Sequence, residues 1–297
     1  MHVGGHSILT PMKIQRATVQ IPGTTANLGP GFDCLGIALA IYNVFTISRA
    51  EVSVPEPMID QAAAAFFAES NVTPFTFHWS IAGDVPRSRG LGSSVTVRLG
   101  LLQGLNELAG LPLTKRELFL LCAKLEGHPD NAAPAAFGGF TVAGANGRVA
   151  RFEVELSLSF VLLIPDFETE TTSARRVMPK TLSVPDAVFS LGNACALTAA
   201  FASKDYASLR GAFADRIHQP YRTPLIPFLP GVIAAAESAG ALGGFLSGSG
   251  STIAAVTLQN SDAVASAMAV ASGLKVCGIR IVNADNEGVK TLSIHSD

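Results

Sequence analysis

The sequence predicts an α+β fold of two closely packed lobes. Strand-like and helix-like segments are grouped rather than strictly alternating, which is typical of α+β layers. The chain has 297 residues, of which 48% are hydrophobic and 15% are charged, so it can bury a large core. It contains no internal repeat, low-complexity tract or long linker. We therefore expect the two lobes to pack closely, with a cleft between them.

The first half of the chain is predicted to hold strands, then helices, then further β-structure. Strands are expected where β-branched and aromatic residues gather or alternate, at residues 19–21, 37–48, 74–82 and 140–143. Helices are expected within residues 55–70 and 95–108, and from Thr114 to about Glu126. Thr114 and Glu117 form a capping-box pattern for that third helix. Residues 127–139 should form a loop with a short helical piece.

The second half begins near Phe160, where residues 161–164 indicate a buried strand before Pro165. Further strands are predicted at residues 253–258 and 275–282. Helices are predicted at residues 185–202, 206–213, 230–239 and 262–272.

Composition argues against several classes of protein. The net charge is -2, so there is no electrostatic footprint for nucleic acid. No apolar run is continuous enough to span a bilayer, and residues 1–13, expected to be a short loose extension, do not resemble a secretory signal. The scattered cysteines contain no Cys-x-x-Cys pair or zinc-like spacing, which favours reduced thiols in a cytoplasmic protein: Cys34, Cys122, Cys195 and Cys277.

The run Pro86-Arg-Ser-Arg-Gly90-Leu-Gly92-Ser-Ser94 is the most informative stretch of the chain. Its glycines let backbone approach a ligand closely, and the helix that follows offers free N–H groups and partial positive charge to an anion. The run lacks the Gly-Lys-Ser/Thr ending of a P-loop, and the chain lacks the paired loops of protein kinases. A phosphate cradle and a capped surface helix are both open on this run alone.

Two other glycine-rich loops flank the phosphate run in the sequence. In Asn27-Leu-Gly-Pro-Gly-Phe-Asp33, the Asn and Asp side chains suit ammonium and hydroxyl groups, although a plain turn explains the same pattern. Residues 246–252, Leu-Ser-Gly-Ser-Gly-Ser-Thr, lie between apolar segments. That position argues against a solvated linker.

The segment Glu126-Gly-His128-Pro-Asp130-Asn131 combines carboxylates with His and Asn at the end of a predicted helix. Hard oxygen ligands of this kind suit Mg²⁺ together with phosphates. The alternative is that Asp130 and Asn131 cap the next helical piece while His128 packs locally.

In their order along the chain, these four segments resemble the homoserine kinase branch of the GHMP small-molecule kinase superfamily. The phosphate run and the last glycine loop match the superfamily as a whole. Residues 27–33 and 128–131 match the branch more narrowly, as do residues 171–175 and the Tyr221-Arg222 pair. The resemblance covers the chain from about Ile14. It implies an N-terminal lobe related to ribosomal protein S5 domain 2, over residues 14–158, and a ferredoxin-like C-terminal lobe, over residues 159–297.

The resemblance also implies an activity: ATP and Mg²⁺ would phosphorylate the side-chain hydroxyl of L-homoserine, a step of threonine biosynthesis. The residues implied to hold the triphosphate are Pro86, Arg89, Gly90, Leu91, Gly92, Ser93, Ser94, Val95 and Thr96. Ser94 and Glu126 would hold the metal. The residues implied to bind the amino acid are Asn27, Asp33, His128, Asn131, Arg175, Arg222 and Gly248. Those implied in catalysis are Asn131, Glu126, Thr171 and Arg222.

The implied roles follow ordinary chemistry. Two guanidinium groups, from Arg175 and Arg222, would clamp the substrate carboxylate, and Thr171 would lie near the hydroxyl. Many relatives place an aspartate base where this chain has Asn131, and an amide cannot serve as a base. We therefore expect in-line alignment, with the proton leaving late to the phosphate, and keep Asp130 as the alternative base.

The chain departs from the family pattern at several positions. Val95-Thr-Val-Arg98 stands where small residues usually follow the two serines, and Arg98 could reach solvent or add charge near the cleft. Ser251 replaces a common proline, and Gly23 a common alanine or serine.

Other functions remain open at this point. They are a superfamily kinase for another small alcohol and a catalytically silent nucleotide-binding relative. Arg175, Arg222 and Asn131 favour a zwitterionic substrate over other alcohols, and the presence of Ser94 and Glu126 speaks against a silent protein. Expected partners are small molecules, with no nucleic acid or membrane. A homodimer is the commonest assembly for such enzymes, but the sequence does not establish the oligomeric state.

Overall fold

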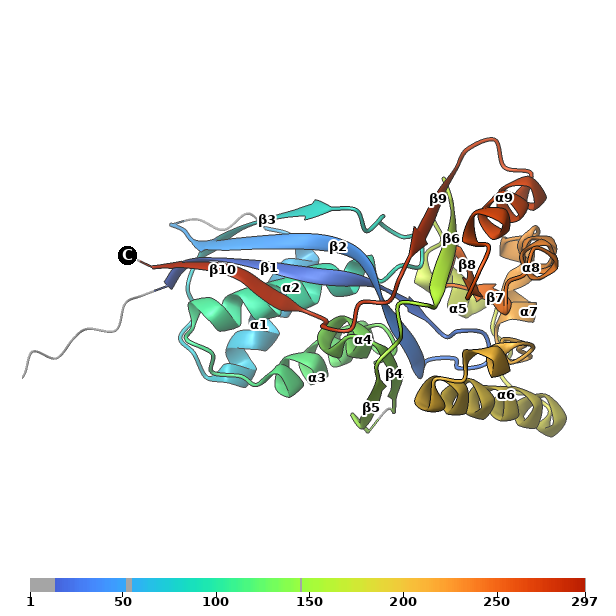
Figure 1. The fold of residues 1–297 in the computed structure, drawn as a ribbon. Coiled ribbons are helices and arrows are strands. Elements are labelled where there is room, and N and C mark those ends of the chain that lie inside the picture. Colours follow the sequence, from blue (N-terminus) through green and yellow to red (C-terminus); the bar gives the residue numbers. More distant parts are fainter. Residues whose placement is uncertain (1–13, 52–54, 145, 297) are drawn as a thin grey trace, which may run out of the picture.

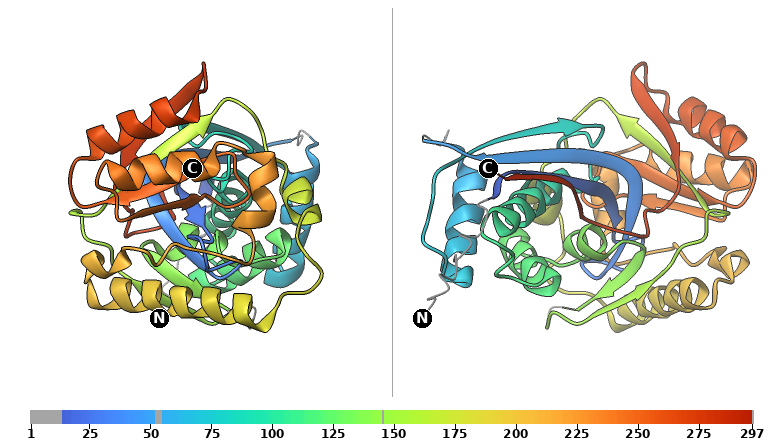
Figure 2. Two further views of the ribbon diagram at one scale, coloured as in Figure 1. Left: turned by 90° about the vertical axis from the view of Figure 1, so that its right-hand side faces the viewer. Right: turned by 60° about the vertical axis from the view of Figure 1, so that its left-hand side comes forward.

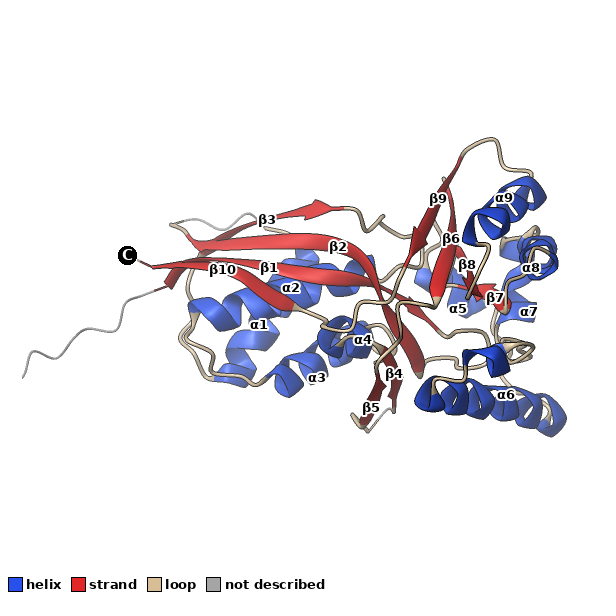
Figure 3. Ribbon diagram, viewed as in Figure 1, coloured by secondary structure: helices blue, strands red, loops and turns tan. Residues whose placement is uncertain are grey.

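The computed structural model describes residues 14–51, 55–144 and 146–296, and it confirms an α+β fold of two lobes (Figure 1). The expected extension at residues 1–13 lies outside the described residues. Figure 3 shows one sheet in each lobe, with helices packed against both sheets.

The first sheet has the order β10-β1-β2-β4-β5, with β3 paired to β2. Its strands are β1 (Ile14–Ala26), β2 (Leu35–Arg49), β3 (Phe77–Gly83), β4 (Phe140–Ala143), β5 (Val149–Phe152) and β10 (Lys290–Ser296). The described ladders are antiparallel. β1 is longer than the expected 19–21, since it continues through Thr24 and Thr25, which are completely buried.

One face of the first sheet is covered by helices, as Figure 1 shows. They are α1 (Pro57–Ser70), α2 (Ser93–Leu108), α3 (Lys115–Glu126) and α4 (Ala132–Phe137). Ile21 and Phe45 from the sheet pack in one core with Phe66, Leu99 and Phe119 from these helices. The predicted capping box at Thr114 and Glu117 is confirmed in both of its hydrogen-bonded halves.

The second sheet has the order β7-β8-β6-β9 and is also antiparallel. Its strands are β6 (Ser159–Pro165), β7 (Gly243–Leu246), β8 (Ile253–Thr257) and β9 (Cys277–Val282). The end-on view in Figure 2 shows α8 (Leu229–Ser238) and α9 (Ser261–Ser272) on one side and α6 (Val184–Ser203) on the other. The expected helix at 206–213 is only a 3₁₀ turn, η1 (Tyr206–Leu209).

β6 links the two lobes because its side chains alternate between two cores. Val161 and Leu163 face the core beneath α8 and α9. Phe160 and Leu162 face a second core that also contains Leu28 and Leu35 from the first lobe. The lobes therefore share a hydrophobic core, as expected for closely packed domains.

By length and composition α6 could cross a membrane, although no such run was expected from the sequence. A single helix of this kind is weak support for a span, because helices of soluble proteins pass the same test. Leu197 and Phe201 of α6 are completely buried in the core that the lobes share. The outer side exposes Val184, Val188 and Leu191.

Three short elements complete the second lobe beside the cleft: α5 (Thr171–Arg176), α7 (Gln219–Arg222) and η2 (Thr223–Leu225).

Candidate active site

A cavity of about 460 Å³ lies between the lobes, and all four segments singled out in the sequence reach it. Its walls come from the loop after β1, the phosphate run, the turn after α3 and the last glycine loop. The start of α5 and Arg222 of α7 close the remaining side.

The phosphate run presents the N-terminus of α2 to this cavity. Gly92 is the N-cap residue, with φ of 69°, and no side chain caps the helix. A Cβ on Gly92 would lie 2.0 Å from Thr24 Oγ1, and one on Gly90 would lie 2.2 Å from the Ser247 carbonyl oxygen. Both positions therefore require glycine. The interpretation as a capped surface helix is wrong, because the first turn of α2 faces a cavity without a capping side chain.

The last glycine loop braces the phosphate run. Ser247 Oγ donates to the Gly90 carbonyl at 2.6 Å, and Thr252 N donates to the Arg89 carbonyl at 3.1 Å. Gly248 N donates to the carbonyl of Ala26 at the end of β1. The loop is thus part of the site's framework.

The residues expected to hold the triphosphate divide into two groups. Those that line the cavity are Gly90, Gly92, Ser93 and Ser94. Those absent from its lining are Pro86, Arg89, Leu91, Val95 and Thr96. Leu91, Val95 and Thr96 are completely buried in the protein, and the Arg89 guanidinium turns to the Pro165 carbonyl and the Asp166 carboxylate.

The two expected metal ligands lie side by side. Ser94 Oγ donates to Glu126 Oε2 at 2.8 Å, and both residues line the cavity next to the N-terminus of α2. A hydroxyl and a carboxylate are hard oxygen donors, so this pair suits Mg²⁺. Arg98, one turn along α2, forms an ion pair with the same carboxylate. Of the two alternatives for Arg98, added charge at the cleft is confirmed.

The turn after α3 is held by Asp130, which is 2% exposed. One of its oxygens, Oδ1, lies 2.5 Å from His128 Nδ1 and accepts from the backbone N–H of Asn131 at 2.9 Å. Asn131 Oδ1 accepts from Thr24 Oγ1 at 2.7 Å, which orients the amide. Burial lowers the pKa of His128, but the hydrogen bond and charge of Asp130 outweigh it, so the net shift of the pKa is upward.

Asp33 and Arg175 form an ion pair in the lining of the cavity. Arg175 makes two hydrogen bonds to the Asp33 carboxylate, at 2.7 and 3.0 Å. Asn27 accepts from the Asp33 N–H at 2.9 Å and donates to the Gly248 carbonyl at 3.0 Å. Asp33, His128 and Asp130 place ligand atoms within 4.8 Å of one another, a cluster that would attract a cationic group. Thr171 also lines the cavity.

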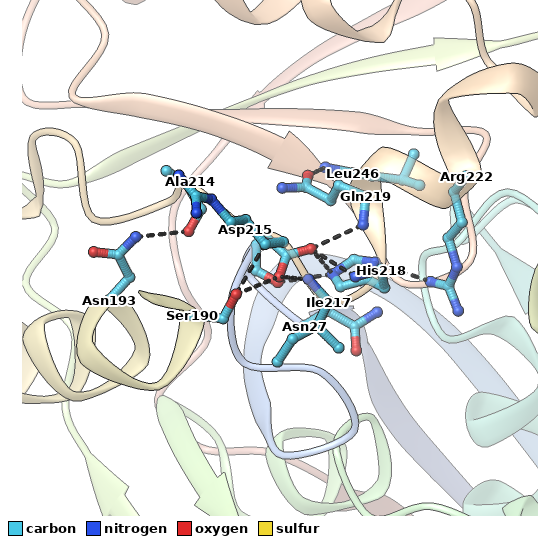
Figure 4. A network of polar contacts seen from close by, with 12 residues as sticks. Asn27, Ser190, Asn193, Ala214, Asp215, Ile217, His218, Gln219, Arg222 and Leu246 are labelled. Atoms are coloured by element: carbon cyan, nitrogen blue, oxygen red, sulfur yellow. Dashed lines mark hydrogen bonds and ion pairs between the residues drawn. The ribbon is translucent and has the colours of Figure 1, made fainter. Parts of the chain in front are cut away.

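Arg222 is 2% exposed and is fixed by a buried polar network (Figure 4). It donates to the Gly248 carbonyl at 2.8 Å and the Ala174 carbonyl at 3.3 Å. His218 Nε2 lies 2.7 Å from the Gly29 carbonyl and therefore carries the proton, so Nδ1 accepts from Arg222 at 3.4 Å. Burial is the main reason that the pKa of Arg222 falls to about 10, and the charge of Arg175 lowers it further. Since this pKa is still well above 7, Arg222 stays cationic at neutral pH.

Asp215 anchors the base of this network and was missed in the sequence. It accepts the backbone N–H groups of Ile217, His218 and Gln219 at 2.7 to 2.9 Å. Burial lowers the pKa of His218 to about 4, although the charge of Asp215 opposes the shift. In the sequence, the one signal that could have identified Asp215 is its position shortly before His218 and Arg222.

The chain matches two family models. The GHMP kinases N terminal domain matches residues 57–139, and the GHMP kinases C terminal domain matches residues 197–272.

Several proteins that are similar to this chain in sequence or structure are homoserine kinases. A homoserine kinase of Caldicellulosiruptor bescii is 35% identical, covering 94% of this chain and 98% of that protein. One of Trichormus variabilis is 39% identical, covering 93% and 98%. The crystal structure of homoserine kinase from Cytophaga hutchinsonii superimposes with a TM-score of 0.85 at 24% identity, over 98% of this chain and all of that one. This chain belongs to the GHMP kinases and, within them, to the homoserine kinases.

Proposed function

We propose that this chain transfers the γ-phosphoryl group of ATP to the side-chain hydroxyl of L-homoserine. The products are O-phospho-L-homoserine and ADP. The observation that carries the proposal is one cavity with two unlike ends: an uncapped helix N-terminus beside Ser94 and Glu126, and a pocket with fixed carboxylates and arginines. The first end suits a polyphosphate and the second a zwitterion.

At the phosphate end, the backbone of Gly90, Gly92 and Ser93 and the dipole of α2 would hold the triphosphate. Ser94 and Glu126 would hold Mg²⁺, which supplies positive charge against the phosphate oxygens when bound.

At the substrate end, Asp33 and Asp130 would attract the amino group, and Asn27, His128 and the Gly248 carbonyl would orient it. Arg222 and Arg175 would bind the carboxylate. Arg175 already makes two hydrogen bonds to Asp33. Its guanidinium would therefore divide its N–H donors between the Asp33 carboxylate and the substrate carboxylate.

The reaction depends on alignment. Asn131 and Thr171 would hold the hydroxyl in line with the γ-phosphorus while the bond to ADP breaks. The Asn131 amide oxygen already accepts from Thr24, and an amide is no base, so the proton passes late to a phosphate oxygen. Holding reactants in near-attack geometry supplies about 7–11 kcal/mol.

The decisive experiment compares alcohols. With Mg-ATP and coupled detection of ADP, L-homoserine should give a kcat/KM at least about 100-fold above mevalonate and galactose. A faster reaction with either of those alcohols would favour another GHMP activity. ADP binding without turnover on any alcohol would favour a silent relative.

We also propose a division into two domains, residues 14–158 and residues 159–297, with β10 of the second range returning to the sheet of the first. We further propose that the chain acts in the cytoplasm.

We propose a homodimer as well. The outer side of α6 supports it, because Val184, Val188 and Leu191 form an uncharged stripe that a second copy of α6 would match. Light scattering after size exclusion tests the assembly.

A further inference from the structure

Arg98 lies on the otherwise largely apolar helix α2, and its side chain reaches the cavity. It lies on α2 four residues after Ser94, on the same face of the helix. Only 15% of the side chain is exposed, and the side chain of its partner Glu126 is 7% exposed. The ion pair is therefore largely removed from water, inside the phosphate end of the site.

The two oxygens of Glu126 have different partners. Oε1 is paired with Arg98, and Oε2 accepts from the Ser94 hydroxyl. A divalent cation can replace the Ser94 hydroxyl proton at Oε2, but it then lies close to a guanidinium. Within the described residues, Arg98 Nε has no hydrogen-bond partner and is buried, so the guanidinium retains an unused donor.

The other arginines in the cavity lining are assigned elsewhere. Arg175 and Arg222 lie at the substrate end, with Asp33 and Gly248. Among the described lining residues, Arg98 is thus the arginine at the end where the α2 N-terminus, Ser94 and Glu126 meet.

We propose that Arg98 is a fixed cation of the phosphate subsite, which competes with the divalent metal for Glu126 and itself attracts the polyphosphate. The proposal rests on the proposed function only in taking this end as the nucleotide end. Its physical basis is charge. A guanidinium a few ångströms away repels a divalent cation and attracts a phosphate chain, and both effects are strong where water is excluded.

The consequence is a divided effect on binding. Arg98 should weaken the binding of a free divalent cation and strengthen the binding of metal-free nucleotide. If Arg98 had only a structural role, its substitution would leave the affinities for the cation and for the nucleotide unchanged, or would lower both together as the fold loosened.

The test uses the full chain and two probes. ADP binding is measured by isothermal titration in EDTA, and Mn²⁺ binding without nucleotide by electron paramagnetic resonance. Arg98→Gln keeps a hydrogen-bond donor for Glu126 but removes the charge, and Arg98→Lys keeps the charge. Arg16→Gln is the matched control, since Arg16 is exposed on β1 and does not line the cavity.

Relative to wild type, Arg98→Gln should bind metal-free ADP about tenfold more weakly and Mn²⁺ about tenfold more tightly. Arg98→Lys should stay within about threefold of wild type for both probes, and so should Arg16→Gln. Unchanged affinities in Arg98→Gln, or parallel losses for both probes, would overturn the assignment. If Arg98→Gln does not fold, Glu126→Gln replaces it: removing the disputed carboxylate should strengthen metal-free ADP binding and abolish Mn²⁺ binding, and weaker ADP binding overturns the assignment.

The proposed function fails by a different result, namely a wild-type chain that binds ADP but does not phosphorylate L-homoserine. That outcome leaves the two titrations able to decide the role of Arg98.

Discussion

Arg222 is held so firmly that its contribution to substrate binding can be isolated. Asn27 also donates to the Gly248 carbonyl that Arg222 binds, so this loop keeps a hydrogen bond when Arg222 is truncated and the nucleotide end should be little disturbed. We expect Arg222→Ala to raise the KM for L-homoserine about 30-fold or more, as for a lost buried charge contact, and the KM for ATP by less than about threefold. Steady-state kinetics measure both. Arg216→Ala is the matched control, because Arg216 is half-exposed and pairs with Asp186. Equal rises in the two KM values would contradict a carboxylate clamp.

Asp130 is the carboxylate adjacent in sequence to Asn131, and it is already occupied as an acceptor. Its Oδ1 holds His128 and Asn131, so it is built as a support for the turn. Since a positioned general base contributes about 10²–10⁴-fold, we expect Asp130→Asn to keep kcat within about tenfold of wild type. The measurement is kcat at saturating ATP and L-homoserine. A loss of three orders of magnitude with intact folding would make Asp130 the base.

His218 should make stability depend on acid pH. Its pKa is lowered from 6.5 to about 4 in the folded protein, chiefly by burial. Between these pH values the unfolded chain binds a proton that the folded chain does not, so the free energy of unfolding falls as pH drops. His218→Gln can still donate to the Gly29 carbonyl but cannot titrate. Urea unfolding at pH 7 and pH 5 should show a smaller loss in the variant. Equal losses would mean that His218 is not the titrating group.

Among elements, the start of α2 gives the sharpest prediction. Alanine at Gly92 must adopt φ of 69° and place its Cβ 2.0 Å from Thr24 Oγ1, so the loop must shift. We expect Gly92→Ala to raise the KM for ATP by more than about tenfold and that for L-homoserine much less. Gly110→Ala is the control, because Gly110 also has positive φ but a Cβ there would have no neighbour within 4 Å. Equal kinetics for both variants would argue against phosphate binding by this loop.

The elements that could be predicted are those with strong local signals. The Thr114 capping box, the apolar period of α2 and the β-branched run of β2 were visible in the sequence. The site loops were found because glycine and polar residues cluster there. β10 was missed although Leu292 and Ile294 alternate with polar residues. The strand is short and both side chains remain about half exposed, so the segment has little of the hydrophobic character that marks a core strand. Residues 206–213 were expected to form a helix, but only one 3₁₀ turn forms, in which Tyr206 and Leu209 are buried.

At the scale of the whole molecule, partners distant in sequence escape local reasoning. Arg98 with Glu126, and Ser190 with Asp215, meet only after the chain has folded, since 28 and 25 sequence positions separate the partners. The pairing of β10 with β1 joins the end of the chain to its beginning, as Figure 1 shows. Capping, periodicity and turn chemistry describe neighbours in sequence, so they located the site without revealing its ion pairs.

The core shared by the lobes predicts that they unfold together. Phe140 of β4 stacks on Phe201 of α6, with ring centroids 4.3 Å apart, and both side chains are completely buried. Phe140→Ala should lower the free energy of unfolding by about 3–5 kcal/mol. Urea unfolding can be followed by the fluorescence of Trp79, the single tryptophan, which lies in the first lobe, and by far-ultraviolet circular dichroism of the whole chain. The two transitions should coincide in wild type and move together in the variant. A variant in which only the tryptophan signal shifts would show that the lobes unfold independently and that this core does not couple them.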